Sequence, residues 1–116
     1  MLLRYPLYMQ QLAFQASERH RKVVLDLAAT IAAIPTVRRV ILYGSRARGD
    51  AEERSDFDIA VDAPDASSRD WVTIFELADD AYTLLEIQIV RLHETGEEFR
   101  QRVAQEGIVL YERGKE

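Results

Sequence analysis

Two short motifs between residues 44 and 58 carry residue types suited to phosphate chemistry: Gly44-Ser45, and then Asp56 and Asp58 one residue apart. Alternate residues of a strand point the same way, so both carboxylates would project from one face of a sheet. Carboxylates this close raise each other's pKa unless a cation lies between them. Their oxygens suit Mg²⁺, and pairs of such ions support nucleotidyl transfer. The spacing therefore predicts Asp56 and Asp58 as metal ligands.

The glycine-serine motif has the features of a phosphate-binding turn. A β-branched segment precedes it, and the letters SRAR that follow Gly44 can begin a short helix, whose first N–H groups attract anions. Glycine lets a phosphate approach the backbone, and arginines add charge-assisted hydrogen bonds. No Gly-Lys-Ser/Thr is present, so this is not a Walker loop. Each motif alone is most often a turn or an exposed strand face; together they predict that Gly44, Ser45, Arg46 and Arg48 bind a nucleotide's phosphates.

Three short apolar segments are expected to form the strands that position these motifs. They are rich in β-branched residues and end at turn-forming residues. Helical patterns separate them, which indicates helices packed on a small sheet. The predicted fold is therefore α/β (α+β), with a small mixed three-stranded sheet built from residues 37–43, 57–61 and 84–92. The last apolar segment, 108–112, is expected to be extended.

The helices are predicted from apolar periodicity and capping patterns. The first covers residues 17–34 and is closed by Pro35. Ser67 with Asp70, and Thr95 with Glu98, match the capping box that opens a helix. The corresponding helices run to about residue 82 and to Gly107, which is placed for a C-terminal cap.

Length and composition limit the class of protein. The 116 residues are enough for one domain, residues 17–116, preceded by an apolar extension, residues 1–16, that is expected to pack on the domain or on a partner. No apolar run is long enough for a membrane span, and no signal peptide is recognisable, which predicts a cytoplasmic location. The absence of cysteine excludes disulfides and thiolate metal sites. The net charge of −5 argues against direct DNA binding.

The chain resembles the DNA polymerase β-like nucleotidyltransferases. The resemblance rests on GSRARG at 44–49, SDFDIAV at 55–61, LLEIQIV at 84–90 and the tail FRQRVAQEGIVLYE at 99–112. Its length and tail are most similar to the minimal nucleotidyltransferases that are antitoxin partners of HEPN-domain proteins. The resemblance implies Mg²⁺, with two ions, and a nucleoside triphosphate as cofactors. It also implies transfer of AMP from ATP to a tyrosine hydroxyl of a HEPN-domain protein, in a hetero-complex or oligomer.

One position departs from the family pattern. The family has a third carboxylate on the next strand, which helps to hold the catalytic metal and accepts the hydroxyl proton. Spacing from the tail puts Gln88 there, and an amide cannot act as a base. Glu86 lies two residues earlier on the same strand face. An offset of the strand by one pair would make Glu86 the third catalytic and metal-binding carboxylate.

Two functions therefore remain open. In the first, the chain is an enzyme, and Asp56, Asp58 and Glu86 form its catalytic and metal-binding set. In the second, Gln88 marks a weakened site, and the fold is a binding module that blocks a HEPN-type toxin by contact. The apolar extension suits the second function, since exposed apolar surface marks an interface.

Overall fold

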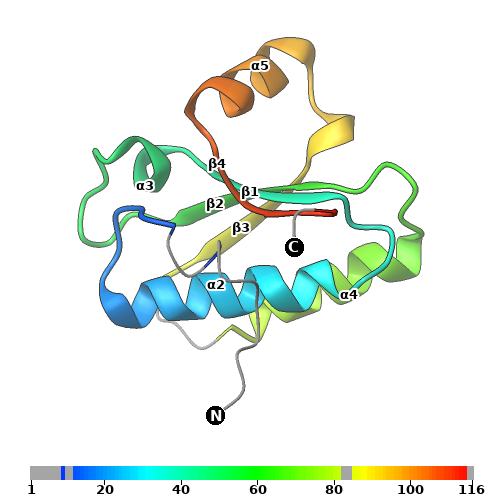
Figure 1. Cartoon of the computed structure of the whole chain (residues 1–116), viewed down its shortest axis with the longest axis horizontal. Helices are drawn as coiled ribbons and strands as arrows, with labels where there is room; N and C mark the ends of the chain where they lie inside the picture. Colours follow the sequence, from blue (N-terminus) through cyan, green and yellow to red (C-terminus); the bar gives the residue numbers. More distant parts are fainter. Residues whose placement is uncertain (1–8, 10–11, 82–84, 115–116) are drawn as a thin grey trace.

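The structure is a computed structural model that describes residues 9, 12–81 and 85–114 (Figure 1). Helices and strands alternate along the chain, as the sequence predicts. Their order is α2 (Glu18–Ala32), β1 (Arg39–Tyr43), α3 (Ser45–Arg48), β2 (Phe57–Asp62), α4 (Ser68–Asp79), β3 (Ile87–Arg91), the 3-10 helix η1 (Leu92–Glu94), α5 (Glu97–Glu106) and β4 (Ile108–Glu112).

The sheet is mixed, as predicted, but has four strands in the order β3-β2-β1-β4. Strand β2 pairs antiparallel with β1 and parallel with β3, so the three predicted strands are neighbours. Strand β4 pairs antiparallel with β1 on its other side. The prediction of three strands is therefore wrong by one, because the extended segment 108–112 finds its partner in β1, far away in the sequence.

The two faces of the sheet are covered differently (Figure 1). Helices α2 and α4 cover one face, over the larger core, to which Phe57 and Ile59 belong. Helix α5 covers the other face, over a smaller cluster that includes Tyr43 and Ala60. Since side chains alternate along a strand, Asp58 lies on the α5 side of the sheet.

One of the two predicted capping boxes forms, and Ser17 provides a further cap that was not predicted. Ser17 accepts a hydrogen bond from the His20 N–H at the start of α2, and Ser67 and Asp70 make both bonds of a capping box at the start of α4. The box predicted for Thr95 and Glu98 is wrong. Helix α5 starts after Gly96, because the Thr95 hydroxyl donates instead to the Leu92 carbonyl at 2.6 Å and closes η1.

The described part of the N-terminal extension packs on the domain. Met9 is fully buried in the larger core, and Leu12 and Phe14 pack against it. The side chain of Gln15 makes two hydrogen bonds of 2.7 Å with the N–H and carbonyl of Ala51. Residues 1–8, 10 and 11, on which the predicted interface mostly depends, lie outside the described residues. No helix in the described ranges is both long and apolar enough to cross a bilayer.

Candidate active site

Asp56 and Asp58 lie on the α5 side of the sheet. Phe57 between them is fully buried in the core on the opposite side. In the sheet register, Asp58 pairs with Tyr43 of β1 and with Gln88 of β3. Asp58 therefore lies between β1 and β3, next to one residue of each strand.

The turn after β1 approaches Asp58 very closely. Gly44 has a φ of 78°, a backbone conformation that side chains disfavour. A Cβ atom at Gly44 would lie 2.6 Å from Asp58 Oδ2, so only glycine fits here. Ser45 follows directly as the first residue of α3. The glycine-serine turn and the carboxylate pair therefore meet at one place, although residues 46–55 separate them in the sequence.

Arg46 does not face this place as a free cation. Its side chain is buried, at 5% exposure, and its guanidinium lies 4.6 Å above the Phe57 ring. It donates hydrogen bonds to the carbonyls of Gln15, Glu53 and Ser55 at distances of 2.9 to 3.3 Å. The expectation that Arg46 binds phosphate is therefore corrected. Its hydrogen bonds instead hold the loop that leads to Asp56 in place.

Arg48, by contrast, is exposed and bound to carboxylates. It pairs with Asp50 at 3.0 Å and with Glu106, the last residue of α5, at 3.2 Å. Glu106 also accepts a hydrogen bond of 3.1 Å from the Gly44 N–H. Sequence reasoning missed Glu106, whose one signal was its place in the tail that resembles the family.

Gln88 lies between two of the predicted site carboxylates. Its amide nitrogen is 3.4 Å from Asp56 Oδ2 and 3.5 Å from Glu86 Oε2. The strand offset that would put Glu86 beside Asp58 does not occur, because Gln88 takes that register position. Among the residues that the structure describes, no three His, Cys, Asp or Glu side chains are grouped so that they could hold a metal ion. The predicted set of Asp56, Asp58 and Glu86 is therefore not assembled here as a three-carboxylate site.

Burial and neighbouring carboxylates together set the electrostatics of the site. Burial raises the pKa of Asp58, the charges of Asp56 and Glu106 raise it further, and Arg48 partly opposes them. Burial, with the charge of Asp58 next, raises the pKa of Tyr43 to about 12. Burial is the larger cause of both shifts, the neighbouring carboxylates add to it, and a cation beside Asp58 would lower both pKa values.

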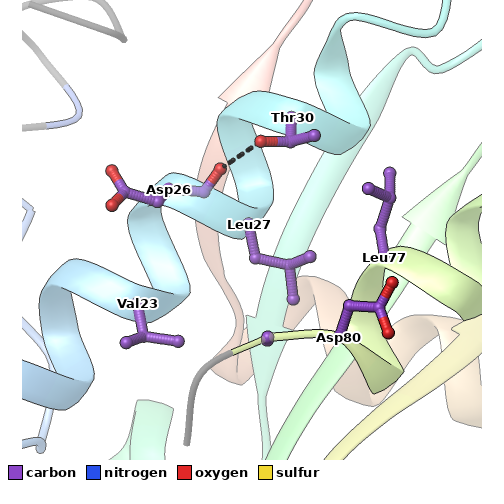
Figure 2. Close-up of a pocket in the computed structure, with 7 residues that line it drawn as sticks. Val23, Asp26, Leu27, Thr30, Leu77 and Asp80 are labelled. Carbon is purple, nitrogen blue, oxygen red and sulfur yellow. Dashed lines mark hydrogen bonds between the residues drawn. The ribbon is translucent and has the colours of Figure 1, made fainter.

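A pocket on the opposite face of the sheet is less suited to a nucleotide. It lies between α2 and α4 and has a volume of about 260 Å³ (Figure 2). Its described lining residues carry two carboxylates, Asp26 and Asp80, and no cation. A phosphate would therefore be repelled there.

Comparison with known proteins agrees with the geometry. The family model described as polymerase beta, nucleotidyltransferase, matches residues 26–116, which include both motifs. The chain belongs to the polymerase β nucleotidyltransferase family. No curated protein shows a significant match.

Solved structures of toxin–antitoxin complexes share the nucleotidyltransferase fold. A structure of a toxin–antitoxin with AMP-PNP matches with 25% identity and a TM-score of 0.62 over 81% of this chain and 74% of that chain. The MntA-HepT toxin–antitoxin matches with 22% identity and a TM-score of 0.56, covering 83% and 73%. The tri-AMPylated Shewanella oneidensis HEPN toxin in complex with MNT antitoxin matches with 22% identity and a TM-score of 0.53, covering 78% and 68%. The chain is thus a nucleotidyltransferase-family protein that shares its fold with chains of these complexes.

The contribution of the Arg46 hydrogen bonds can be tested by measuring the stability of a variant that lacks them. Arg46→Met keeps the apolar stem over Phe57 but leaves three carbonyls without their donor. We expect the free energy of unfolding to fall by about 2–4 kcal/mol, as when partners of buried polar groups are removed. Urea unfolding measures this. The control is Arg54→Met, at an exposed position of the same loop, which should change stability by less than about 0.5 kcal/mol. Equal losses in both variants would contradict the assignment.

The crowding at Asp58 predicts a pH-dependent gain in stability for Asp58→Asn. The folded-state pKa of Asp58 is raised, so ionising it opposes folding once the pH exceeds its unfolded pKa. The variant should therefore be more stable than the wild type at pH 7, and the difference should vanish below about pH 3, where both states are protonated.

Urea midpoints measured with a chelator, to exclude metal binding, check this expectation. Glu76→Gln on the exposed side of α4 is the matched charge change and should have little effect. A less stable Asp58→Asn variant at pH 7 would show that the carboxylate is held by favourable contacts.

Proposed function

We propose that this chain is a Mg²⁺-dependent nucleotidyltransferase that moves AMP from ATP to a hydroxyl of a HEPN-type toxin and thereby acts as an antitoxin. The observation that carries the proposal is the contact between Gly44 and Asp58. It brings the glycine-serine turn, which would bind phosphate, next to the carboxylate pair, which would bind metal. The relation to a toxin–antitoxin structure with AMP-PNP supports ATP as the donor, and the relation to an AMPylated toxin complex supports the acceptor.

Asp56 and Asp58 fit Mg²⁺. The ion is commonly held by one or two carboxylates and takes its remaining oxygens from water and phosphates. Burial and then the charge of Asp56 raise the pKa of Asp58, and a bound cation would oppose both effects. When bound, the metal, as one ion or as the two that the family implies, would stabilise charge on the attacking and leaving oxygens. Asp56 and Asp58 would position it against the phosphates.

The phosphate side of the site would consist of Gly44, Ser45 and Arg48. The Gly44 N–H is a hydrogen-bond donor close to Asp58, Ser45 follows it with a hydroxyl, and the exposed guanidinium of Arg48 can exchange partners. Arg46 would act only by holding its loop in place. In the reaction, the acceptor oxygen bonds to the α-phosphorus, the bond to pyrophosphate breaks, and the hydroxyl proton passes to a base.

Glu86 is the carboxylate available to serve as that base. It faces the Gln88 amide at 3.5 Å, on the same side of the sheet as the aspartates. It lies two residues before Gln88, the register partner of Asp58, and has a longer side chain than aspartate. We propose that Glu86 accepts the proton and that Gln88 orients it.

A second function is favoured by one specific observation, the register of Gln88 beside Asp58. An amide in the usual position of a catalytic carboxylate removes a base and a negative metal ligand. The chain would then block its toxin by contact alone. The N-terminal extension would contribute to either complex.

The two functions are separated by a pair of variants. The chain, a HEPN-type partner, ATP and Mg²⁺ are mixed, and the intact mass of the partner is measured. If Glu86 is the base, Glu86→Gln should lower AMP transfer at least about a hundredfold, the lower range of general-base catalysis. Gln88→Ala removes only the amide that orients Glu86, so it should lower transfer much less than Glu86→Gln does.

The opposite result supports the contact-only antitoxin. In that case the wild type transfers no AMP, Gln88→Asp creates or raises transfer, and Glu86→Gln changes nothing. The chain should then still inhibit the toxin although it transfers no AMP to it. Transfer by the wild type that is insensitive to Glu86→Gln would instead remove Glu86 from the proposal and leave the enzyme.

A further inference from the structure

Glu106 joins the C-terminal end of α5 to the turn after β1. Its side chain is only 15% exposed, although it carries a charge. One oxygen accepts from the Gly44 N–H at 3.1 Å, and both oxygens lie within 3.3 Å of Arg48 Nη1. This carboxylate therefore holds two of the groups that the proposed function gives to phosphate.

The position of Glu106 is fixed by the residue that follows it. A Cβ atom at Gly107 would lie 2.4 Å from the Val103 carbonyl oxygen and 2.6 Å from Ile41 Cγ2. The end of α5 can therefore pack closely against β1. Glu106, the last residue of α5, then lies beside the end of that strand. The contact with Gly44 follows from backbone packing and needs no flexible loop.

The same donors cannot fully serve two anions. A backbone N–H makes one strong hydrogen bond, and Arg48 already shares its guanidinium between Asp50 and Glu106. A triphosphate that reaches Gly44 and Arg48 must take these bonds from Glu106. Glu106 also adds a negative charge to a site where Asp56 and Asp58 already crowd.

We propose that Glu106 is an internal carboxylate that competes with the triphosphate for the phosphate donors and is displaced by it, so that it sets nucleotide affinity. The inference rests on the proposed function and deepens it. A side-chain rotation is enough for the exchange. Arg102 lies four residues earlier on the same helix, at the spacing at which opposite charges interact, and can receive the released carboxylate.

The first test measures binding of Mg-ATP by calorimetry to the wild type, Glu106→Gln and Glu106→Ala. Removing the competing carboxylate should lower the Kd about three- to tenfold for alanine, the range expected for loss of an ion pair and a charged hydrogen bond. Glutamine keeps an acceptor but no charge, so its gain should be smaller. Tripolyphosphate with Mg²⁺ should show the same order, because the competition concerns phosphates and not the base.

Two controls separate this role from a general change in charge. Asp50→Asn removes another carboxylate partner of Arg48 but leaves the Gly44 contact, so its gain should be less than that of Glu106→Ala. Glu98→Gln, at an exposed position of the same helix, should leave the Kd unchanged. Without nucleotide, the amide proton of Gly44 should shift in the NMR spectrum of Glu106→Ala and stay in place in Asp50→Asn.

The outcomes are distinct. An unchanged or weaker Kd in folded Glu106 variants, or an unmoved Gly44 amide, overturns the competitor role while nucleotide binding by the wild type leaves the proposed function standing. Absence of binding in the wild type and in every variant overturns both, since Glu106→Ala is the protein in which binding should be easiest to detect.

Discussion

The close approach of Gly44 to Asp58 is the constraint on which the site depends. The antiparallel pairing of β1 and β2 sets Tyr43 opposite Asp58, so the residue after Tyr43 must turn away over the aspartate. The turn requires a positive φ and leaves no room for a Cβ atom. Glycine satisfies both conditions. The glycine-serine turn and the carboxylate pair, to which the proposed function gives phosphate and metal binding, are thus held next to each other by sheet pairing.

The two arginines of the GSRARG motif have different roles because one is buried and the other is exposed. Arg46 is enclosed and satisfied by backbone carbonyls, so it fixes the loop before any ligand arrives. A loop that is already ordered loses little entropy on binding. Arg48, one helical half-turn later, is exposed and held by carboxylates that an incoming anion can replace. One motif therefore contains both a buried arginine that keeps the loop rigid and an exposed arginine whose partners can be exchanged.

Local patterns predicted much of the fold, and long-range contacts account for what they missed. The alternation around Phe57 gave the face of Asp56 and Asp58, and the box at Ser67 gave the start of α4. No local period reveals that β4 pairs with β1, or that Arg46 is buried under the carbonyls of distant residues. The proposed role of Glu106 depends on its contact with Gly44, 62 positions away in the sequence, which only the folded chain creates.

The charges of the site favour a ligand that is positive at one end and negative at the other. Asp56 and Asp58 repel each other and call for a cation, whereas Gly44 and Arg48 offer donors to an anion. A free phosphate would satisfy the donors but add to the repulsion, and a free cation would relieve the aspartates but leave Glu106 on the donors. A metal–triphosphate complex complements both halves at once. The short distance between the halves, set by Gly44, then matches a ligand whose metal and phosphate oxygens are in direct contact.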